Sequence, residues 1–160
     1  MDRYDFVLAG KDDIVCVAEF WYSLIGTPGS HWRGEYPNVD RAREDVDGGM
    51  LYLLKDGDEI VASVTIHPSE KHSVELFPAL EKPCEISRLG VARHMQRQGI
   101  GRMMTERAVE LSKQMDYDGM GLLVSKYNSF ARRMYDKIGF ELCGEVTLWE
   151  IDFVCYQMVF

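Results

Sequence analysis

The chain has 160 residues, 46% of them hydrophobic, and a formal net charge of -8 at pH 7. This length fits one domain with a sizeable core, and the lack of any run of about 18 apolar residues argues against a membrane-spanning helix. The acidic balance argues against nucleic acid as a partner. Because residues 1–6 are too acidic and too poor in apolar residues for a signal peptide, we expect a cytoplasmic protein.

The first half of the chain predicts three strands and two helices. In chain order these are a strand, two helices and two strands, over residues 5–9, about 14–25, 39–47, 50–54 and 60–66. Asp12 or Asp13 caps the first helix, and Gly26 ends it. Asp56 and Gly57 form a strong hairpin signal between the last two strands.

The second half predicts a strand, a helix, a strand, a helix and two strands, over residues 85–91, 100–115, 120–125, 129–138, 140–146 and 148–160. Asn128 caps the second helix, and Gly139 closes it where left-handed geometry is usual. A strand, a helix and another strand in succession imply a parallel crossover. The fold class is therefore α/β (α+β), with one domain over residues 1–160 and a central mixed, mostly antiparallel sheet of about seven strands flanked by about four helices.

The sequence predicts neither a metal site nor a disulfide. The four cysteines stand far apart without a C-x-x-C pair, and His67 and His72 lack a third ligand at a suitable spacing. We expect the cysteines to be reduced and mostly buried.

Positive charge is concentrated in one segment. Residues 1–60 hold 6 Lys+Arg and 13 Asp+Glu, a net of -7, whereas residues 85–115 hold 6 and 3, a net of +3. Such a basic segment suits a polyanionic ligand, and acidic surroundings favour a cationic second substrate. The alternative is that these charges are merely solvated.

Residues 85–102 combine a strand, a basic turn with two glycines and the start of a helix. A helix start exposes unpaired backbone N–H groups and carries partial positive charge. Gly99 and Gly101 let the backbone approach an anion closely, which predicts a phosphate-binding loop. A nucleoside triphosphate loop would need a Lys after its second glycine, and a dinucleotide fingerprint a third glycine where Met104 stands. A flexible helix start is the plainer alternative.

Two motifs resemble those of the GNAT superfamily of acetyl-CoA-dependent N-acetyltransferases. Gln96, Gly99 and Gly101 match its loop pattern Gln/Arg-x-x-Gly-x-Gly/Ala. About 30 residues further on, the pattern Asn-x-x-Ala-x-x-x-Tyr-x-x-x-Gly-Phe is matched by Asn128, Ala131, Tyr135, Gly139 and Phe140. The chain departs from the family in Arg93, where a proline is common before the loop, and in Gly90, where alanine is frequent.

The resemblance implies where acetyl-CoA, the co-substrate, binds. The loop amides would hold its pyrophosphate, and the fourth and fifth strands would splay apart to admit the pantetheine arm. The alternation of apolar residues shifts from even to odd positions between Ile86 and Leu89, which is compatible with a bulge there. The implied cofactor contacts are Leu89, Gly90, Val91, Gln96, Arg97, Gln98, Gly99, Ile100, Gly101, Arg102, Asn128 and Tyr135.

The resemblance also implies direct attack of a primary amine on the thioester in a ternary complex. The N–H of Leu89 would polarise the thioester carbonyl, and Tyr135 would protonate the departing thiolate. Glu85 stands where several family members carry the base, with a water chain or a plain strand-edge charge as alternatives. Ser87 and Tyr156 are lesser candidates for the base. For Tyr135 the alternative is a core aromatic, and for Asn128 a helix cap.

The same resemblance predicts which residues line one side of the binding site for the acceptor amine, here called the acceptor wall. In the family the region after the first helix forms this wall, so Trp32, Glu35 and Tyr36 are candidate substrate contacts, with packing as local core as the alternative. We expect a small-molecule or peptide amine as acceptor, no nucleic acid, no membrane and, by family habit, a homodimer. The rival functions are a non-catalytic acyl-CoA-binding or sensing module on the same fold and a nucleotide-binding domain.

Overall fold

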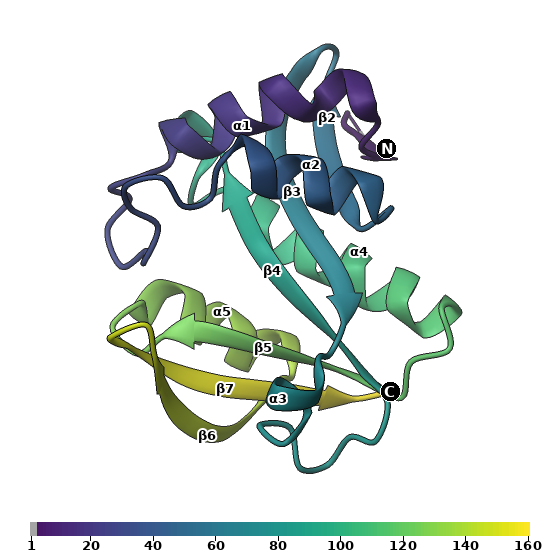
Figure 1. The fold of residues 1–160 in the computed structure, drawn as a ribbon, viewed down its shortest axis with the longest axis vertical. Helices are drawn as coiled ribbons and strands as arrows, with labels where there is room; N and C mark the ends of the chain where they lie inside the picture. Colours follow the sequence, from purple (N-terminus) through teal and green to yellow (C-terminus); the bar gives the residue numbers. More distant parts are fainter. Residues whose placement is uncertain (1–2) are drawn as a thin grey trace. The chain divides into compact units, whose positions relative to one another are not determined.

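The computed structural model describes residues 3–160, apart from the side chains of Lys71 and His72. Within these residues seven strands form one mixed sheet in the order β1-β2-β3-β4-β5-β7-β6 (Figure 1). The pair β4–β5 is parallel, and the pairs β1–β2, β2–β3, β5–β7 and β6–β7 are antiparallel. The predicted mixed, mostly antiparallel sheet is thereby confirmed.

The elements follow the predicted order. The strands are β1 (Asp5–Leu8), β2 (Leu51–Asp56), β3 (Glu59–Pro68), β4 (Pro83–Val91), β5 (Gly119–Ser125), β6 (Glu141–Leu148) and β7 (Ile151–Val159). The helices are α1 (Ile14–Ser23), α2 (Val39–Asp47), α3 (Lys71–Val74), α4 (Ile100–Gln114) and α5 (Ser129–Ile138), with single 3-10 turns at η1 (Lys11–Asp13) and η2 (Arg93–Met95). The short α3 and the two 3-10 turns are the elements that the sequence did not predict.

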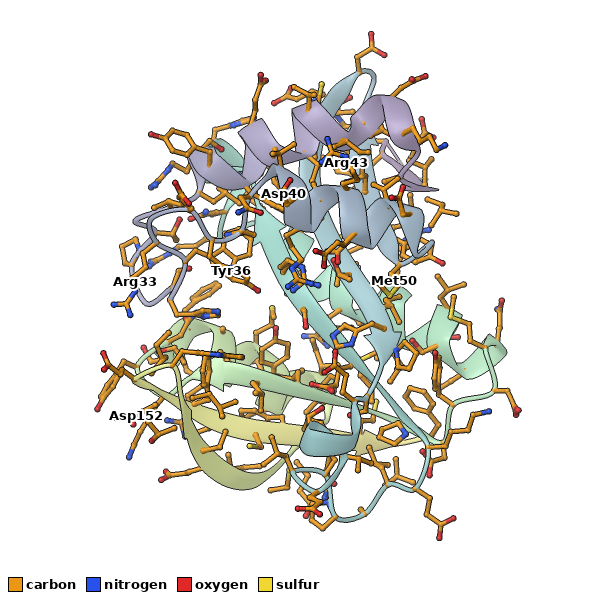
Figure 2. All side chains as sticks on the ribbon, in the orientation of Figure 1. Arg33, Tyr36, Asp40, Arg43, Met50 and Asp152 are labelled. Carbon is orange, nitrogen blue, oxygen red and sulfur yellow. The ribbon has the colours of Figure 1, made fainter. Side chains whose placement is uncertain are left out.

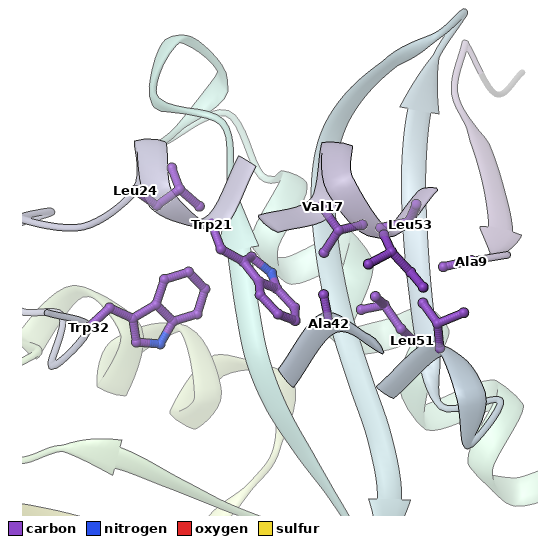
Figure 3. Close-up of a cluster of buried hydrophobic side chains, with 10 residues drawn as sticks. Ala9, Val17, Trp21, Leu24, Trp32, Ala42, Leu51 and Leu53 are labelled. Carbon is purple, nitrogen blue, oxygen red and sulfur yellow. The ribbon is translucent and has the colours of Figure 1, made fainter. Parts of the chain in front are cut away.

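One compact unit runs to Thr27 and also contains Trp32–Ile66 and Arg88–Thr105. Its core forms because α1 presents one apolar face, with Ile14, Val17 and Trp21 buried. These side chains pack with residues of α2, β2 and the loop before α2 (Figure 3), namely Ala42, Val46, Leu51, Leu53 and Trp32.

The other compact unit contains Pro28–His31, His67–Ser87 and Glu106–Phe160. Here β4 pairs with β5 over Pro83–Glu85 and Gly119–Gly121. A register of three residues is short for strands of this length, in keeping with a pair that splays. The apolar face of α5 buries Tyr135, and Gly139 ends that helix with a φ of 112°, as predicted.

Among the described residues, no helix is both long enough and apolar enough to cross a membrane. Met1 and Asp2, on which part of the signal-peptide argument rests, lie outside the described residues.

Candidate functional site

The glycine loop connects η2 to α4 within the first unit. Gly99 has a φ of 84°, and a Cβ built there would meet no atom within 4 Å. The side-chain amide of Gln96 donates to the carbonyl of Val91 (3.0 Å), which ties the loop to the end of β4. The N–H of Met103 donates to the carbonyl of Gly99 (3.0 Å), so Gly99 stands directly at the start of α4. This is the backbone geometry of an anion-binding turn.

A break in β4 precedes Leu89. Arg88 has a φ of 51°, which is rare for a residue with a side chain inside a strand. Its carbonyl accepts a hydrogen bond from Ser63 Oγ at 3.2 Å, and Ser63 Oγ itself accepts from Trp21 Nε1 at 2.9 Å. The irregularity expected from the apolar pattern of this strand therefore lies at Arg88.

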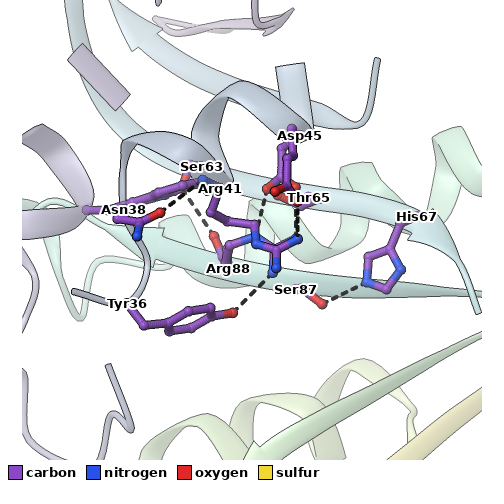
Figure 4. A network of polar contacts seen from close by, with 11 residues as sticks. Tyr36, Asn38, Arg41, Asp45, Ser63, Thr65, His67, Ser87 and Arg88 are labelled. Atoms are coloured by element: carbon purple, nitrogen blue, oxygen red, sulfur yellow. Dashed lines mark hydrogen bonds and ion pairs between the residues drawn. The ribbon is translucent and has the colours of Figure 1, made fainter. Parts of the chain in front are cut away.

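A buried ion pair holds the Arg88 side chain (Figure 4). Its Nε and Nη2 donate to the two carboxylate oxygens of Asp45 at 2.7 and 3.0 Å, a two-pronged arrangement. The side chains of Asp45 and Arg88 are only 1% and 9% exposed. Thr65 Oγ1 also donates to Asp45 at 2.8 Å, so the carboxylate has three hydrogen bonds. This Asp45–Arg88 clamp joins α2 to the distorted part of β4.

The clamp extends to the predicted acceptor wall. Arg88 Nη1 donates to the phenolic oxygen of Tyr36 at 3.1 Å. The backbone of Tyr36 exchanges two hydrogen bonds with that of Arg33, at 3.1 and 3.2 Å, which shapes a tight loop (Figure 2). Tyr36 and Glu35 are exposed, so both side chains can be reached by a ligand.

Trp32, the third wall candidate, is buried. It packs edge-on against Trp21, with ring centroids 6.4 Å apart. A Cβ at Gly90 would lie 2.7 Å from Leu24 Cδ1 and 3.1 Å from Trp32 Cη2. Trp32 thus occupies the local core, and its packing explains why glycine stands at position 90.

The second unit contains the other predicted catalytic residues. Glu85 is buried, and its Oε2 accepts hydrogen bonds from Ser69 Oγ and Ser73 Oγ, both at 2.7 Å. Tyr135 is buried against Phe140 and Tyr156, with ring centroids 5.6 and 6.0 Å away. The Tyr135 phenol, like any tyrosine, is protonated at neutral pH, and burial raises its pKa further, which makes it a weaker acid than an exposed phenol.

The remaining predicted contact, Asn128, caps α5. Its Oδ1 accepts from the N–H of Ala131 at 3.1 Å, the cap expected from sequence. The predicted site residues are therefore divided between the two compact units. Leu89, Gly90, Val91, the loop over 96–102 and the wall candidates belong to the first, and Glu85, Asn128 and Tyr135 to the second.

Sequence reasoning missed the Asp45–Arg88 clamp and a hydrogen bond between His67 and Ser87. One signal for the clamp was available, because Asp45 lies on the buried face of α2 beside Ala42 and Val46. A carboxylate on an apolar helix face needs a partner.

Two of the cysteine thiols are poor nucleophiles at neutral pH. Burial raises the pKa of Cys84 and of Cys143 to about 11, so both thiols stay protonated at neutral pH. All four cysteines are free; Cys84 and Cys155 are buried, Cys143 is intermediate and Cys16 is exposed. In the part of the chain that the structure describes, no three His, Cys, Asp or Glu side chains are grouped as metal ligands.

Comparison with known proteins agrees with this picture. The model of the acetyltransferase (GNAT) family matches residues 18–140. A GNAT-family acetyltransferase from Listeria monocytogenes 4b F2365 has a TM-score of 0.80 at 17% identity, covering 98% of this chain and 95% of that chain. Arabidopsis thaliana NAA60 in complex with acetyl-CoA has a TM-score of 0.79 at 16% identity, covering 98% and 99%.

A ribosomal-protein-alanine N-acetyltransferase from Brucella melitensis has a TM-score of 0.79 at 14% identity, covering 98% of this chain and 99% of that chain. No curated protein matches the chain significantly. At these identities the solved structures establish a shared fold.

Proposed function

The chain belongs to the GNAT acetyltransferase family, and on that premise we propose that it transfers an acetyl group from acetyl-CoA to a primary amine by direct attack in a ternary complex. The glycine loop is the observation that carries the proposal. Gly99 combines a left-handed backbone with open space where a Cβ would stand, directly before the first turn of α4. Both features let the backbone approach a pyrophosphate closely.

Within this proposal each of the chain's own groups has one task. The amides over residues 96–102 hold the pyrophosphate, with Arg97 and Arg102 as nearby cations. The N–H of Leu89, which follows the left-handed backbone of Arg88, donates to the thioester carbonyl, where negative charge develops during attack. Tyr135, whose phenol is protonated at neutral pH, gives its proton to the leaving thiolate. Glu85 is one candidate for the base that takes the proton of the acceptor amine.

The acceptor that we propose is a cationic amine. The net charge of -7 over residues 1–60 favours such a ligand. Glu35 and Tyr36, both exposed, are the contacts proposed for it, whereas the buried Trp32 supports the loop from below. A small-molecule amine, a lysine side chain or a peptide N-terminus satisfies this chemistry.

Thermal unfolding with acetyl-CoA, coenzyme A, ATP and NAD tests the cofactor. A ligand at about 100 times its dissociation constant adds roughly 2.7 kcal/mol to the free energy of unfolding, which raises the melting temperature measurably. We expect a rise with acetyl-CoA and coenzyme A and none with ATP or NAD. A rise with ATP or NAD alone would replace this proposal with a nucleotide-binding domain.

An amine panel then tests catalysis. Release of coenzyme A would be followed with spermidine, kanamycin, a lysine peptide and a peptide with a free N-terminus. Acetylation of at least one amine is expected. Binding of acetyl-CoA without transfer to any amine would instead identify a non-catalytic acyl-CoA-binding module.

A further inference from the structure

His67 and Ser87 form a hydrogen-bonded pair on neighbouring strands of the second unit. His67 lies near the end of β3 and Ser87 in β4, and His67 Nε2 is 2.9 Å from Ser87 Oγ (Figure 4). The other ring nitrogen, Nδ1, is 3.0 Å from the carbonyl oxygen of Pro68. Both side chains are partly exposed, so solvent or a ligand can reach them.

These contacts fix which nitrogen carries the proton. A carbonyl oxygen can only accept, so Nδ1 of His67 is the donor to Pro68. In the neutral imidazole the lone pair is then on Nε2, and Ser87 must donate its hydroxyl proton to it. A hydroxyl that donates to an oriented imidazole is the arrangement by which proteins move a proton off a hydroxyl group.

Glu85, the base that the sequence suggests, is engaged in a structural role. Its Oε2 accepts hydrogen bonds from Ser69 and Ser73, which lie just before and within α3. Both distances are 2.7 Å, and Glu85 is only 7% exposed. The carboxylate thereby fastens the connection between β3 and β4 and is poorly accessible to an amine.

Ser87 stands between the two groups on β4 that the proposed reaction uses. It lies two residues after Glu85, on the same face of the strand because side chains alternate. It also lies two residues before Leu89, so the two backbones are about 7 Å apart at most along the chain. Ser87 is therefore close to the amide that we assign to the thioester carbonyl.

We propose that Ser87 and His67 together accept the proton of the acceptor amine, an inference that rests on the acetyl transfer proposed above. The acceptor ammonium gives one proton to Ser87 Oγ as Ser87 gives its own to His67 Nε2. The neutral amine attacks the thioester carbon, the carbon–sulfur bond breaks as Tyr135 gives its proton to the thiolate sulfur, and the second proton of the amine restores the Tyr135 phenol. The products are the amide, coenzyme A and the imidazolium of His67.

Ser87→Ala and His67→Gln test the pair in the intact chain, with the panel amine that the wild-type protein acetylates fastest. General-base catalysis contributes about 10²-fold or more, so we expect kcat to fall by about 10²-fold in each variant while KM for acetyl-CoA and its thermal shift stay unchanged. The double variant should lose no more than either single one, since the two groups act in series. His94→Gln is the matched control, because it removes an exposed imidazole that pairs with Glu59.

Chemical rescue separates proton transfer from a structural role. In His67→Ala, 4-methylimidazole should restore more activity than 4-bromoimidazole, which has a similar size and lower basicity. Equal rescue by both imidazoles would overturn the proposed pair. Activity of Ser87→Ala within about threefold of wild type, together with an inactive Glu85→Gln, would also overturn it and would assign the base to Glu85. A wild-type protein that neither binds acetyl-CoA nor acetylates any amine would overturn the acetyl transfer itself, a result distinct from the others.

Discussion

At the scale of single residues, Gly99 is the sharpest test of the loop. Its φ of 84° costs an alanine about 1 kcal/mol, and the added Cβ would enter the open space proposed for the pyrophosphate. Gly57, in the β2–β3 hairpin, has a φ of 63° and equally open space, which makes it a matched control. We expect Gly99→Ala and Gly57→Ala to lose similar stability, whereas only Gly99→Ala loses affinity for acetyl-CoA by calorimetry. Equal affinities of the two variants for acetyl-CoA would show that the loop is not part of the binding site.

Tyr135 is the residue that separates catalysis from binding. Tyr135→Phe keeps the buried ring against Phe140 and Tyr156 but removes the only proton that the side chain can give. Steady-state kinetics should show kcat lowered by about 10²-fold with an unchanged KM for acetyl-CoA, since loss of a general acid affects the transition state alone. Unchanged turnover would show that Tyr135 is only a core aromatic residue, the alternative that its helical spacing also allows.

At the scale of elements, the Asp45–Arg88 clamp joins α2 to β4. Removing one partner leaves a buried charge unpaired, which costs about 3–5 kcal/mol. Asp45→Asn should therefore lower the free energy of unfolding in urea by several-fold more than Asp13→Asn. Asp13 pairs with Lys55 at 2.8 Å, but both side chains are more than 20% exposed, at 21% and 25%, and such pairs contribute about 1 kcal/mol or less. Similar losses in the two variants would show that the clamp does not support the fold.

The same clamp shows where sequence reasoning ends. Local signals placed α2 over the observed residues and found both ends of α5, because Asn128 and Gly139 act within their own turns. They also located the glycine loop. The clamp joins residues 43 positions apart, and the pair His67–Ser87 spans 20, so no local pattern identifies the partner of Asp45 or of Ser87. The helix α3 has only four residues, too few for a periodic pattern.

At the scale of the whole molecule, buried phenols make stability sensitive to alkali. Burial raises the pKa of Tyr52, Tyr117 and Tyr135. An unfolded chain releases these protons near pH 10, whereas the folded protein keeps them to higher pH. The folded state then binds more protons, so the free energy of unfolding is unaffected below about pH 9 and falls as the pH rises above about 10.

Tyr135 is the most deeply buried of the three, so Tyr135→Phe should show a shallower decline. Urea unfolding at about pH 8 and about pH 11 measures the difference. Tyr22→Phe, which removes an exposed phenol, should follow the wild-type curve. Parallel curves for all three proteins would mean that Tyr135 titrates alike in the folded and unfolded chains.

The contact of Gly90 with Trp32 and Leu24 sets a size limit at position 90. A methyl group there would lie 2.7 Å from Leu24 Cδ1 and 3.1 Å from Trp32 Cη2. An alanine would therefore require the flexible Leu24 side chain to move and the Trp32 ring to give by a few tenths of an ångström. Repacking at this one strand position would thus be felt both at the end of α1 and in the loop that carries Trp32.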